Sequence, residues 1–208
     1  MEFIFDGPID GPLFLFAHGA GADANSEFMT TIAQGLATQG VRVARFNFPY
    51  MQQRLIDGIK RPPNRAPKLV EFFTELVMNC EQPVFIGGKS MGGRIASMVA
   101  AQNDENLNKK IKGVICLGYP FHPQGKPEKL RIEHLKDITA PLFIAQGTRD
   151  KLGSQEEIMA YELNKNIDFL WLEDGDHDFK PRVKSGLTQK AHYKMTIICI
   201  KNTLKLHK

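Results

Sequence analysis

The chain has 208 residues, of which 42% are hydrophobic and 24% are charged, and its 27 Lys and Arg against 23 Asp and Glu give a formal net charge of +4. This length suits one domain that buries roughly 70% of its unfolded surface, and the composition excludes disordered and collagen-like chains. Three scattered cysteines, Cys80, Cys116 and Cys199, are odd in number and form no C-x-x-C pair, which argues against a disulfide framework and a zinc ribbon.

Short apolar runs bounded by Gly or Pro alternate with longer segments of helical period along the chain. This pattern predicts an α/β fold with a mostly parallel sheet and helices on both faces. In chain order, strands are expected near 13–17, 41–46, 84–88, 113–118, 141–146 and 168–172, and the first few residues can add an edge strand. Helices are expected near 26–38, 67–79, 91–103, 154–163 and 187–206. The strands are hydrophobic almost throughout, which indicates burial on both faces of the sheet.

No internal repeat or interdomain linker interrupts this pattern, so residues 1–208 are expected to form a single domain. The only loose stretch lies at 51–67 and is rich in Pro, Arg and Gly. In the last predicted helix, the lysines fall within a narrow arc, which indicates a solvated stripe on a packed helix: Lys190, Lys194, Lys201, Lys205 and Lys208. The apolar residues expected to pack are Leu187, Ala191, Met195, Ile198 and Leu204.

The segment 84–94 is the most informative part of the sequence: a buried strand runs into Gly88-Lys89-Ser90-Met91-Gly92 and then into a helix. A Gly-x-Ser-x-Gly turn between a strand and a helix exposes a serine in a strained backbone geometry, and the small flanking residues relieve the crowding. Such a serine can act as a nucleophile when a base and oxyanion donors are near. Ser90 is therefore the candidate nucleophile.

Two other interpretations of the same residues need consideration. Gly88-Lys89-Ser90 matches the end of a phosphate-binding P-loop, but that motif needs a glycine five positions before Gly88, where the chain has Pro83. The P-loop interpretation therefore fails. A glycine-rich turn used only for close packing of a helix on a strand remains an alternative.

A second small-residue turn follows the first long strand, with the sequence His18-Gly19-Ala20-Gly21. Acyl transfer builds negative charge on one oxygen, and two backbone amides aimed at that oxygen stabilise it. The amide of Ala20, paired with that of Met91, is the candidate oxyanion hole. His18 is expected to shape this loop and is a weaker candidate for contact with the substrate.

The remaining catalytic groups must lie on loops at the same edge of the sheet. One predicted strand ends at Asp150 and the next leads to His177, which gives the chain order Ser90, Asp150, His177. His177 is the candidate base and Asp150 the candidate acid that orients it. Rival acids lie close to the histidine in the sequence: Asp174, Asp176 and Asp178. His122, in a loop after the fourth long strand, is a candidate for substrate contact.

These motifs resemble the α/β-hydrolase superfamily, and within it the short, lidless, dienelactone-hydrolase-like group. The resemblance covers nearly the whole chain. The segments 45–50 (RFNFPY) and 118–123 (GYPFHP) resemble a subgroup of small hydrolase-like proteins related to a domain of chromatin-associated NSL-complex subunits. A dienelactone hydrolase of the usual kind carries cysteine as nucleophile, so Ser90 favours esterase chemistry. The resemblance implies an α/β-hydrolase fold and a Ser-His-Asp triad.

Many members of this superfamily carry a lid between the fourth main strand and the acid-bearing strand. Only residues 120–140 intervene here, which is too few for a folded cap, so an open site is expected. A small or exposed substrate fits such a site. Arg54, Arg61 and Arg65 in the loose stretch are candidates for holding an anionic group on the substrate, and a solvated loop is the alternative.

The sequence also bears on location and partners. No apolar stretch reaches the length of a membrane span and the first residues are acidic where a signal peptide is basic, so a cytoplasmic protein without a membrane partner is expected. Basic residues concentrate in 54–68 and 180–208, but no nucleic-acid recognition motif accompanies them, so no nucleic-acid partner is expected. No cluster has metal-ligand spacing, and neither a metal nor an organic cofactor is expected.

Two functions are compatible with these features. The first is a serine hydrolase that cleaves a carboxylic ester or thioester of a small-molecule substrate through an acyl-enzyme. The second is a hydrolase-shaped binding or scaffold protein with little turnover. A complete triad favours the first, because a protein without catalytic work has no chemical reason to keep all three groups.

Overall fold

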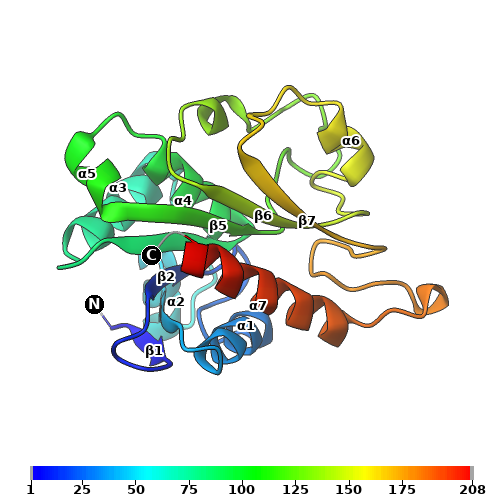
Figure 1. Ribbon diagram of the computed structural model, residues 1–208. Coiled ribbons are helices and arrows are strands. Elements are labelled where there is room, and N and C mark those ends of the chain that lie inside the picture. Colours follow the sequence, from blue (N-terminus) through cyan, green and yellow to red (C-terminus); the bar gives the residue numbers. More distant parts are fainter. Residues whose placement is uncertain (1, 207–208) are drawn as a thin grey trace.

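Seven strands form one sheet, in the order β1-β3-β2-β4-β5-β6-β7, in a computed structural model that describes residues 2–206 (Figure 1). The strands are β1 (Ile4–Asp6), β2 (Leu13–Ala17), β3 (Arg42–Phe46), β4 (Val84–Lys89), β5 (Ile111–Leu117), β6 (Leu142–Gly147) and β7 (Ile167–Leu172). All neighbouring pairs are parallel except β1 with β3, where Phe5 lies opposite Ala44 in an antiparallel pair. The predicted mostly parallel sheet and its N-terminal edge strand are therefore confirmed.

Helices cover both faces of the sheet. They are α1 (Glu27–Ala37), α2 (Pro49–Asp57), α3 (Ala66–Met78), α4 (Met91–Ala100), α5 (Glu105–Lys110), α6 (Gln155–Met159) and α7 (Gln189–Leu206), with short 3-10 turns η1 (Glu133–Lys136) and η2 (Val183–Ser185). α1 and α7 pack on one face, where Phe14, Phe16 and Phe85 of the sheet meet Ile32 and Ile200. α3 and α4 pack on the other face, so every central strand is buried on both sides.

The stretch predicted to be loose contains a helix. α2 begins at Pro49, in the first turn where proline is tolerated, and ends before Gly58, which adopts a left-handed conformation (φ 71°). Pro49 and Gly58 are the start and stop signals of this helix. The prediction that 51–67 is a loop is therefore wrong for residues 51–57. The predicted helix at 154–163 is shorter than expected and ends at Met159.

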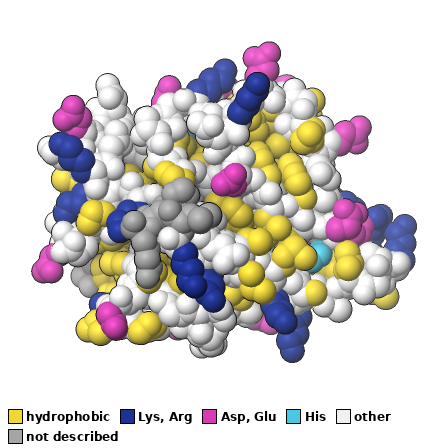
Figure 2. Space-filling view, viewed as in Figure 1, with side chains coloured by type: hydrophobic (Ala, Val, Ile, Leu, Met, Phe, Trp, Pro, Cys, Tyr) yellow, Lys and Arg dark blue, Asp and Glu magenta, His cyan; other side chains and the backbone are white. Residues whose placement is uncertain are grey.

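The packing face predicted for the last helix is also wrong in part. Leu204 is buried as expected, but Leu187, Met195 and Ile198 are 40%, 46% and 44% exposed, and Ala191 is exposed as well. Hydrophobic side chains reach the surface near α7 (Figure 2). The side chain of Ile197 fills the space beside Gly35, where a Cβ would lie 2.2 Å from Ile Cδ1, and this fit against α1 selects the buried face. That face holds His192, Thr196 and Ile200.

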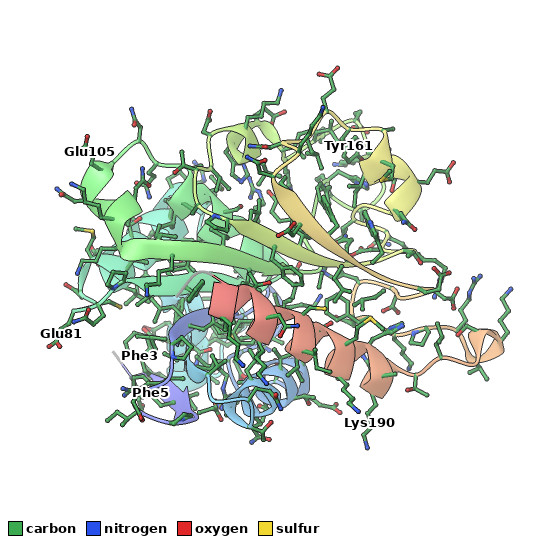
Figure 3. All side chains as sticks on the ribbon, in the orientation of Figure 1. Phe3, Phe5, Glu81, Glu105, Tyr161 and Lys190 are labelled. Atoms are coloured by element: carbon green, nitrogen blue, oxygen red, sulfur yellow. The ribbon has the colours of Figure 1, made fainter. Side chains whose placement is uncertain are left out.

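The lysines of this helix lie on its solvent side. Lys190, Lys194 and Lys205 are exposed, and Figure 3 shows Lys190 pointing away from the body of the protein. Lys208 lies outside the described residues. Lys201 is half-buried and donates to the Gln39 side-chain oxygen at 2.9 Å, so the predicted solvated stripe is found for three of the four described lysines. Among residues 2–206, no helix is long and apolar enough to cross a membrane.

The segment between β5 and β6 forms no lid. Residues 118–141 contain the single turn η1, and the two largest side chains at the start of the segment, Tyr119 and Phe121, are fully buried in the core. The carboxyl edge of the sheet consequently stays uncovered by this segment. The expectation of a lidless fold is confirmed.

Candidate active site

Ser90 occupies a sharp turn between β4 and α4. Its backbone has φ 51° and ψ −115°, a conformation that L-residues rarely adopt. A Cβ on Gly88 would lie 2.4 Å from the carbonyl oxygen of Ala17, and one on Gly92 would lie 2.5 Å from the same atom. Both glycines are thus required by the close approach of β2, and the turn presents the serine side chain at the edge of the sheet.

His177 and Asp150 lie beside Ser90 on loops that follow β7 and β6. The Oγ atom of Ser90 is 2.9 Å from Nε2 of His177, and Nδ1 of the same ring is 2.7 Å from Oδ2 of Asp150. The Asp150 carboxylate is fully buried, whereas the His177 side chain keeps 28% of its surface exposed. The structure therefore brings the three predicted residues into one continuous hydrogen-bonded chain.

The surroundings of Asp150 fix its orientation. Oδ1 accepts a hydrogen bond from the Leu152 amide at 2.8 Å, and Oδ2 accepts one from the Gln146 side-chain amide at 3.0 Å in addition to that from His177. All three partners are hydrogen-bond donors, and together they hold both carboxylate oxygens in place. The Gln146 side chain is itself held by Tyr119 and Gly153.

The three rival acids have other partners. Asp174 pairs with Arg182 and Arg149, and the hydrogen bonds from Arg182 lower the pKa of the Asp174 carboxyl to about 2. Asp176 accepts the backbone amides of residues 178 and 180 through Oδ1. Asp178 lies 3.2 Å from the Lys89 ammonium. Among the acidic residues that the structure describes, only Asp150 bonds to the His177 ring.

The loop that follows β2 is organised around His18. Its ring is fully buried: Nε2 accepts the amide of Phe48 at 3.1 Å, and Nδ1 lies 2.6 Å from the carbonyl oxygen of Gly19. Burial lowers the pKa of His18, which keeps the ring neutral with its proton on Nδ1. The Gly19 carbonyl belongs to the same peptide unit as the Ala20 amide, so this bond polarises a candidate oxyanion donor. His18 shapes the loop as predicted, and its buried ring corrects the weaker expectation that it contacts substrate.

The motif at residues 45–50 holds the same loop from the adjacent strand. Arg45 donates to the carbonyl oxygen of Ala24 at 2.6 Å, and the Asn47 side-chain oxygen accepts the Ala24 amide at 2.9 Å. The Tyr50 hydroxyl donates to the carbonyl oxygen of Ala20 at 2.9 Å. The role of this motif in holding the loop could not be predicted from the sequence, because hydrogen bonds from side chains to a distant backbone leave no periodic pattern.

A cavity of about 490 Å³ opens onto the serine and the histidine. Its lining includes Gly19, Ala20, Lys89, Ser90, His177 and Tyr193, and none of the lining residues comes from 118–141. Within the described part of the chain, neither the Ala20 amide nor the Met91 amide donates to a protein acceptor. Both amides therefore remain available to donate a hydrogen bond to a ligand oxygen.

The other predicted substrate-contact residues lie outside this cavity. Arg54 lines a neighbouring cavity of about 470 Å³ that shares Gly21, Ala22 and Ser26 with the first. Arg61 forms a two-pronged ion pair with Asp57, and Arg65 lines a separate surface hollow. His122 is 2% exposed and lines another cavity, whose lining includes Asp150 but neither Ser90 nor His177. Of the three arginines, only Arg54 lines a cavity that shares residues with the one beside Ser90.

A second serine and histidine also touch. Ser97 Oγ lies 2.9 Å from Nε2 of His134, but Ser97 is fully buried within α4 and its hydroxyl also donates to the carbonyl oxygen of Arg94. Burial lowers the pKa of His134 to about 4, and no carboxylate bonds to this ring in the described residues. This pair lacks an acid, an opening and a strained turn, so it does not have the geometry of a nucleophile site. No group of three His, Cys, Asp or Glu among residues 2–206 is arranged to hold a metal ion.

The fold and the Ser-His-Asp geometry define the class of α/β hydrolases. A family model described as an alpha/beta hydrolase domain matches residues 10–205, and the chain belongs to this family. The kinship with NSL-complex subunits stays a prediction.

Solved structures share the fold at low sequence identity. An alpha-beta serine hydrolase homologue from Coxiella burnetii is 18% identical, with a TM-score of 0.65 over 97% of this chain and 88% of that one. Est1E from Butyrivibrio proteoclasticus, with ferulic acid bound, is 16% identical, with a TM-score of 0.68 over 96% and 95% of the two chains. A dienelactone hydrolase from Anabaena variabilis is 18% identical, with a TM-score of 0.62 over 92% and 86%.

Proposed function

We propose that this protein is a serine hydrolase that cleaves a carboxylic ester or thioester through an acyl-enzyme on Ser90. His177 takes the Ser90 proton on Nε2 while Oγ attacks the carbonyl carbon. The carbonyl oxygen becomes an anion that the Ala20 and Met91 amides bind. When the intermediate collapses, His177 passes the proton to the leaving alcohol or thiol. Water then attacks the acyl group by the reverse sequence of proton transfers and frees Ser90.

The observation that carries this proposal is the hydrogen-bonded chain from Ser90 Oγ to His177 at 2.9 Å and on to Asp150 at 2.7 Å. Ser90 stands in a strained turn whose two glycines have no room for a side chain. Strain of this kind persists where the surrounding structure enforces it, and it clusters at sites of chemistry. A turn needed only for packing would require neither the buried Asp150 carboxylate nor a His177 ring that bonds to both Asp150 and Ser90.

Small or exposed acyl groups fit this site best. The cavity holds about 490 Å³, which suits a small substrate, and its lining mixes Phe28, Met29 and Tyr193 with the charged side chains of Glu27 and Lys89. Segment 118–141 supplies no cover, so water reaches the acyl-enzyme freely. This access favours hydrolysis over transfer to a second acceptor.

Hydrolysis of p-nitrophenyl acetate by the purified protein tests the proposal. We expect Ser90→Ala to lower kcat by more than about 10³-fold, as the loss of a triad nucleophile does in serine hydrolases. Ser97→Ala is the matched control, because it removes the other serine hydroxyl that touches a histidine. Activity that survives in Ser90→Ala, or disappears only in Ser97→Ala, contradicts the proposal.

A further inference from the structure

We infer that Lys89 is a positioning residue that ties the His177 loop to the nucleophile turn and sets the electrostatic balance at the imidazole. This inference rests on the proposed function of Ser90 and His177. Lys89 is the residue between Gly88 and Ser90 in the Gly-x-Ser-x-Gly turn. A surface lysine at this position needs no explanation, but this side chain is 6% exposed.

The Lys89 ammonium bonds to the backbone of the histidine itself. Nζ lies 2.6 Å from the carbonyl oxygen of His177 and 3.2 Å from Oδ1 of Asp178. His177 belongs to the stretch between β7 and η2, which contains no helix or strand. This bond therefore joins the residue next to the nucleophile to the residue that carries the base, and the two residues are 88 positions apart in the chain.

Two aromatic rings and a glycine surround the Lys89 ammonium. Nζ lies 5.1 Å from the ring centre of Phe28 and 5.9 Å from that of Phe179, within reach of a cation–π attraction. Gly118 has φ 63°, and a Cβ there would lie 2.9 Å from the His177 carbonyl oxygen and 3.1 Å from Nζ. A side chain at position 118 would therefore enter the path of the lysine.

Burial of a lysine opposes its charge, and burial here lowers the pKa of Lys89, while the nearby carboxylates of Asp178, Asp150 and Asp176 act in the opposite direction. Such a buried charge is costly unless its partners are good, and Lys89 has a carbonyl, a carboxylate and two aromatic faces. Methionine would fill the same slot without this cost. The charge is thus better explained by its bond to the His177 loop than by packing.

Hydrogen bonds fix His177 at both its side chain and its main chain. Asp150 and Ser90 bond to its ring, whereas Lys89 bonds to its main chain. Without the main-chain bond, the loop is free to drift while the ring turns to follow Asp150. A displacement of about 1 Å at a catalytic group costs about 100-fold in rate.

The charges around the imidazole make the role of Lys89 measurable through pH. Groups facing His177 are Asp150 after β6, Lys89 on β4, Asp176 and Asp178 on its own loop, and, across the cavity, Glu27 of α1 and Tyr193 of α7. Catalysis requires the neutral imidazole, so kcat/KM rises with pH. Loss of the Lys89 charge stabilises the imidazolium and moves the midpoint of this rise to higher pH, whereas loss of the Asp178 charge moves it to lower pH.

The test is the pH profile of p-nitrophenyl acetate hydrolysis by Lys89→Met, Asp178→Asn and the wild type. Lys89→Met keeps the length of the side chain and removes its charge. We expect kcat to fall about 10- to 100-fold, with KM little changed and the midpoint raised by about half a pH unit or more. Lys165→Met is the matched control, because Lys165 is exposed and precedes the amino end of β7, away from the carboxyl edge that carries the site. This variant should leave kcat and the midpoint unchanged.

A role in packing alone predicts a different result. In that case the kcat of Lys89→Met falls only in proportion to the fraction of protein that is unfolded, and the midpoint of the pH profile does not change. This outcome overturns the inference. If Lys89→Met does not fold, Lys89→Gln decides, because it removes the charge and keeps a hydrogen-bond donor: a raised midpoint supports the inference and an unchanged one overturns it. Wild-type protein that lacks Ser90-dependent hydrolysis would refute the proposed function instead, so the two failures are distinguishable.

Discussion

Replacement of Asp150 by asparagine separates orientation of the base from the shape of the site. The two carboxylate oxygens of Asp150 receive only donors: Leu152 at 2.8 Å, Gln146 at 3.0 Å and the His177 ring at 2.7 Å. In Asp150→Asn, the new NH₂ group must face a donor in either orientation. If it faces His177, the ring proton moves to Nε2, and that nitrogen can no longer accept the proton of Ser90.

The magnitude follows from these contacts. With its proton on the wrong nitrogen, a catalytic histidine loses about 10⁴-fold in kcat, which corresponds to about 5 kcal/mol of transition-state stabilisation. If the NH₂ group faces Leu152 instead, a buried backbone donor loses its acceptor, which costs about 1–3 kcal/mol of folding free energy. We therefore expect Asp150→Asn to lose both activity and stability, and the loss of activity to exceed what unfolding explains.

Two assays check this reasoning: kcat on p-nitrophenyl acetate and the urea midpoint of unfolding. Asp104→Asn is the matched control, because its retained side-chain oxygen still accepts the amides of residues 106 and 107. It should keep both values near those of the wild type. Equal loss of kcat in the two variants, or an Asp150→Asn protein with wild-type kcat, would refute the assignment of the acid.

Three further predictions concern the frame of the site. Gly92→Ala places a Cβ 2.5 Å from the Ala17 carbonyl oxygen and should lose about 1–3 kcal/mol in urea unfolding, whereas Gly21→Ala, with nothing within 4 Å, should not. His18→Ala removes the acceptor of the Phe48 amide and should lower kcat by up to about 100-fold with KM little changed, and an unchanged kcat would contradict the role of its loop. Asp174→Asn should lower the urea midpoint at neutral pH, because folding depresses the pKa of Asp174 to about 2 from 3.8. The difference in urea midpoint between wild type and variant should be full above about pH 4 and disappear as pH falls through about 2. A difference that does not depend on pH would contradict this prediction.

Much of the fold could be predicted because its signals are local. Buried parallel strands are apolar along their whole length, as in Leu13–Ala17, so each main strand was visible from the sequence. Helix α2 was missed because an arginine- and proline-rich composition outweighed its two termini, Pro49 and Gly58. The packing face of α7 depends on the fit of Ile197 beside Gly35, some 160 positions away, and no helical period contains that contact.

The triad was accessible for a different reason. Parallel strands place their carboxyl ends at one edge, so chain order and strand ends are enough to bring Ser90, Asp150 and His177 together. The groups that support them were not accessible. Lys89, Arg45 and Tyr50 act through backbone oxygens of distant loops, and a backbone acceptor has no residue type to reveal it.

Mass spectrometry of the protein after reaction with a fluorophosphonate tests the central claim most directly, because this reagent phosphonylates a serine only where a base and oxyanion donors activate it. We predict one adduct, on the peptide that contains Ser90, which Ser90→Ala abolishes and His177→Ala strongly reduces. An unmodified wild-type protein, or an adduct on another serine such as Ser97, would contradict the account.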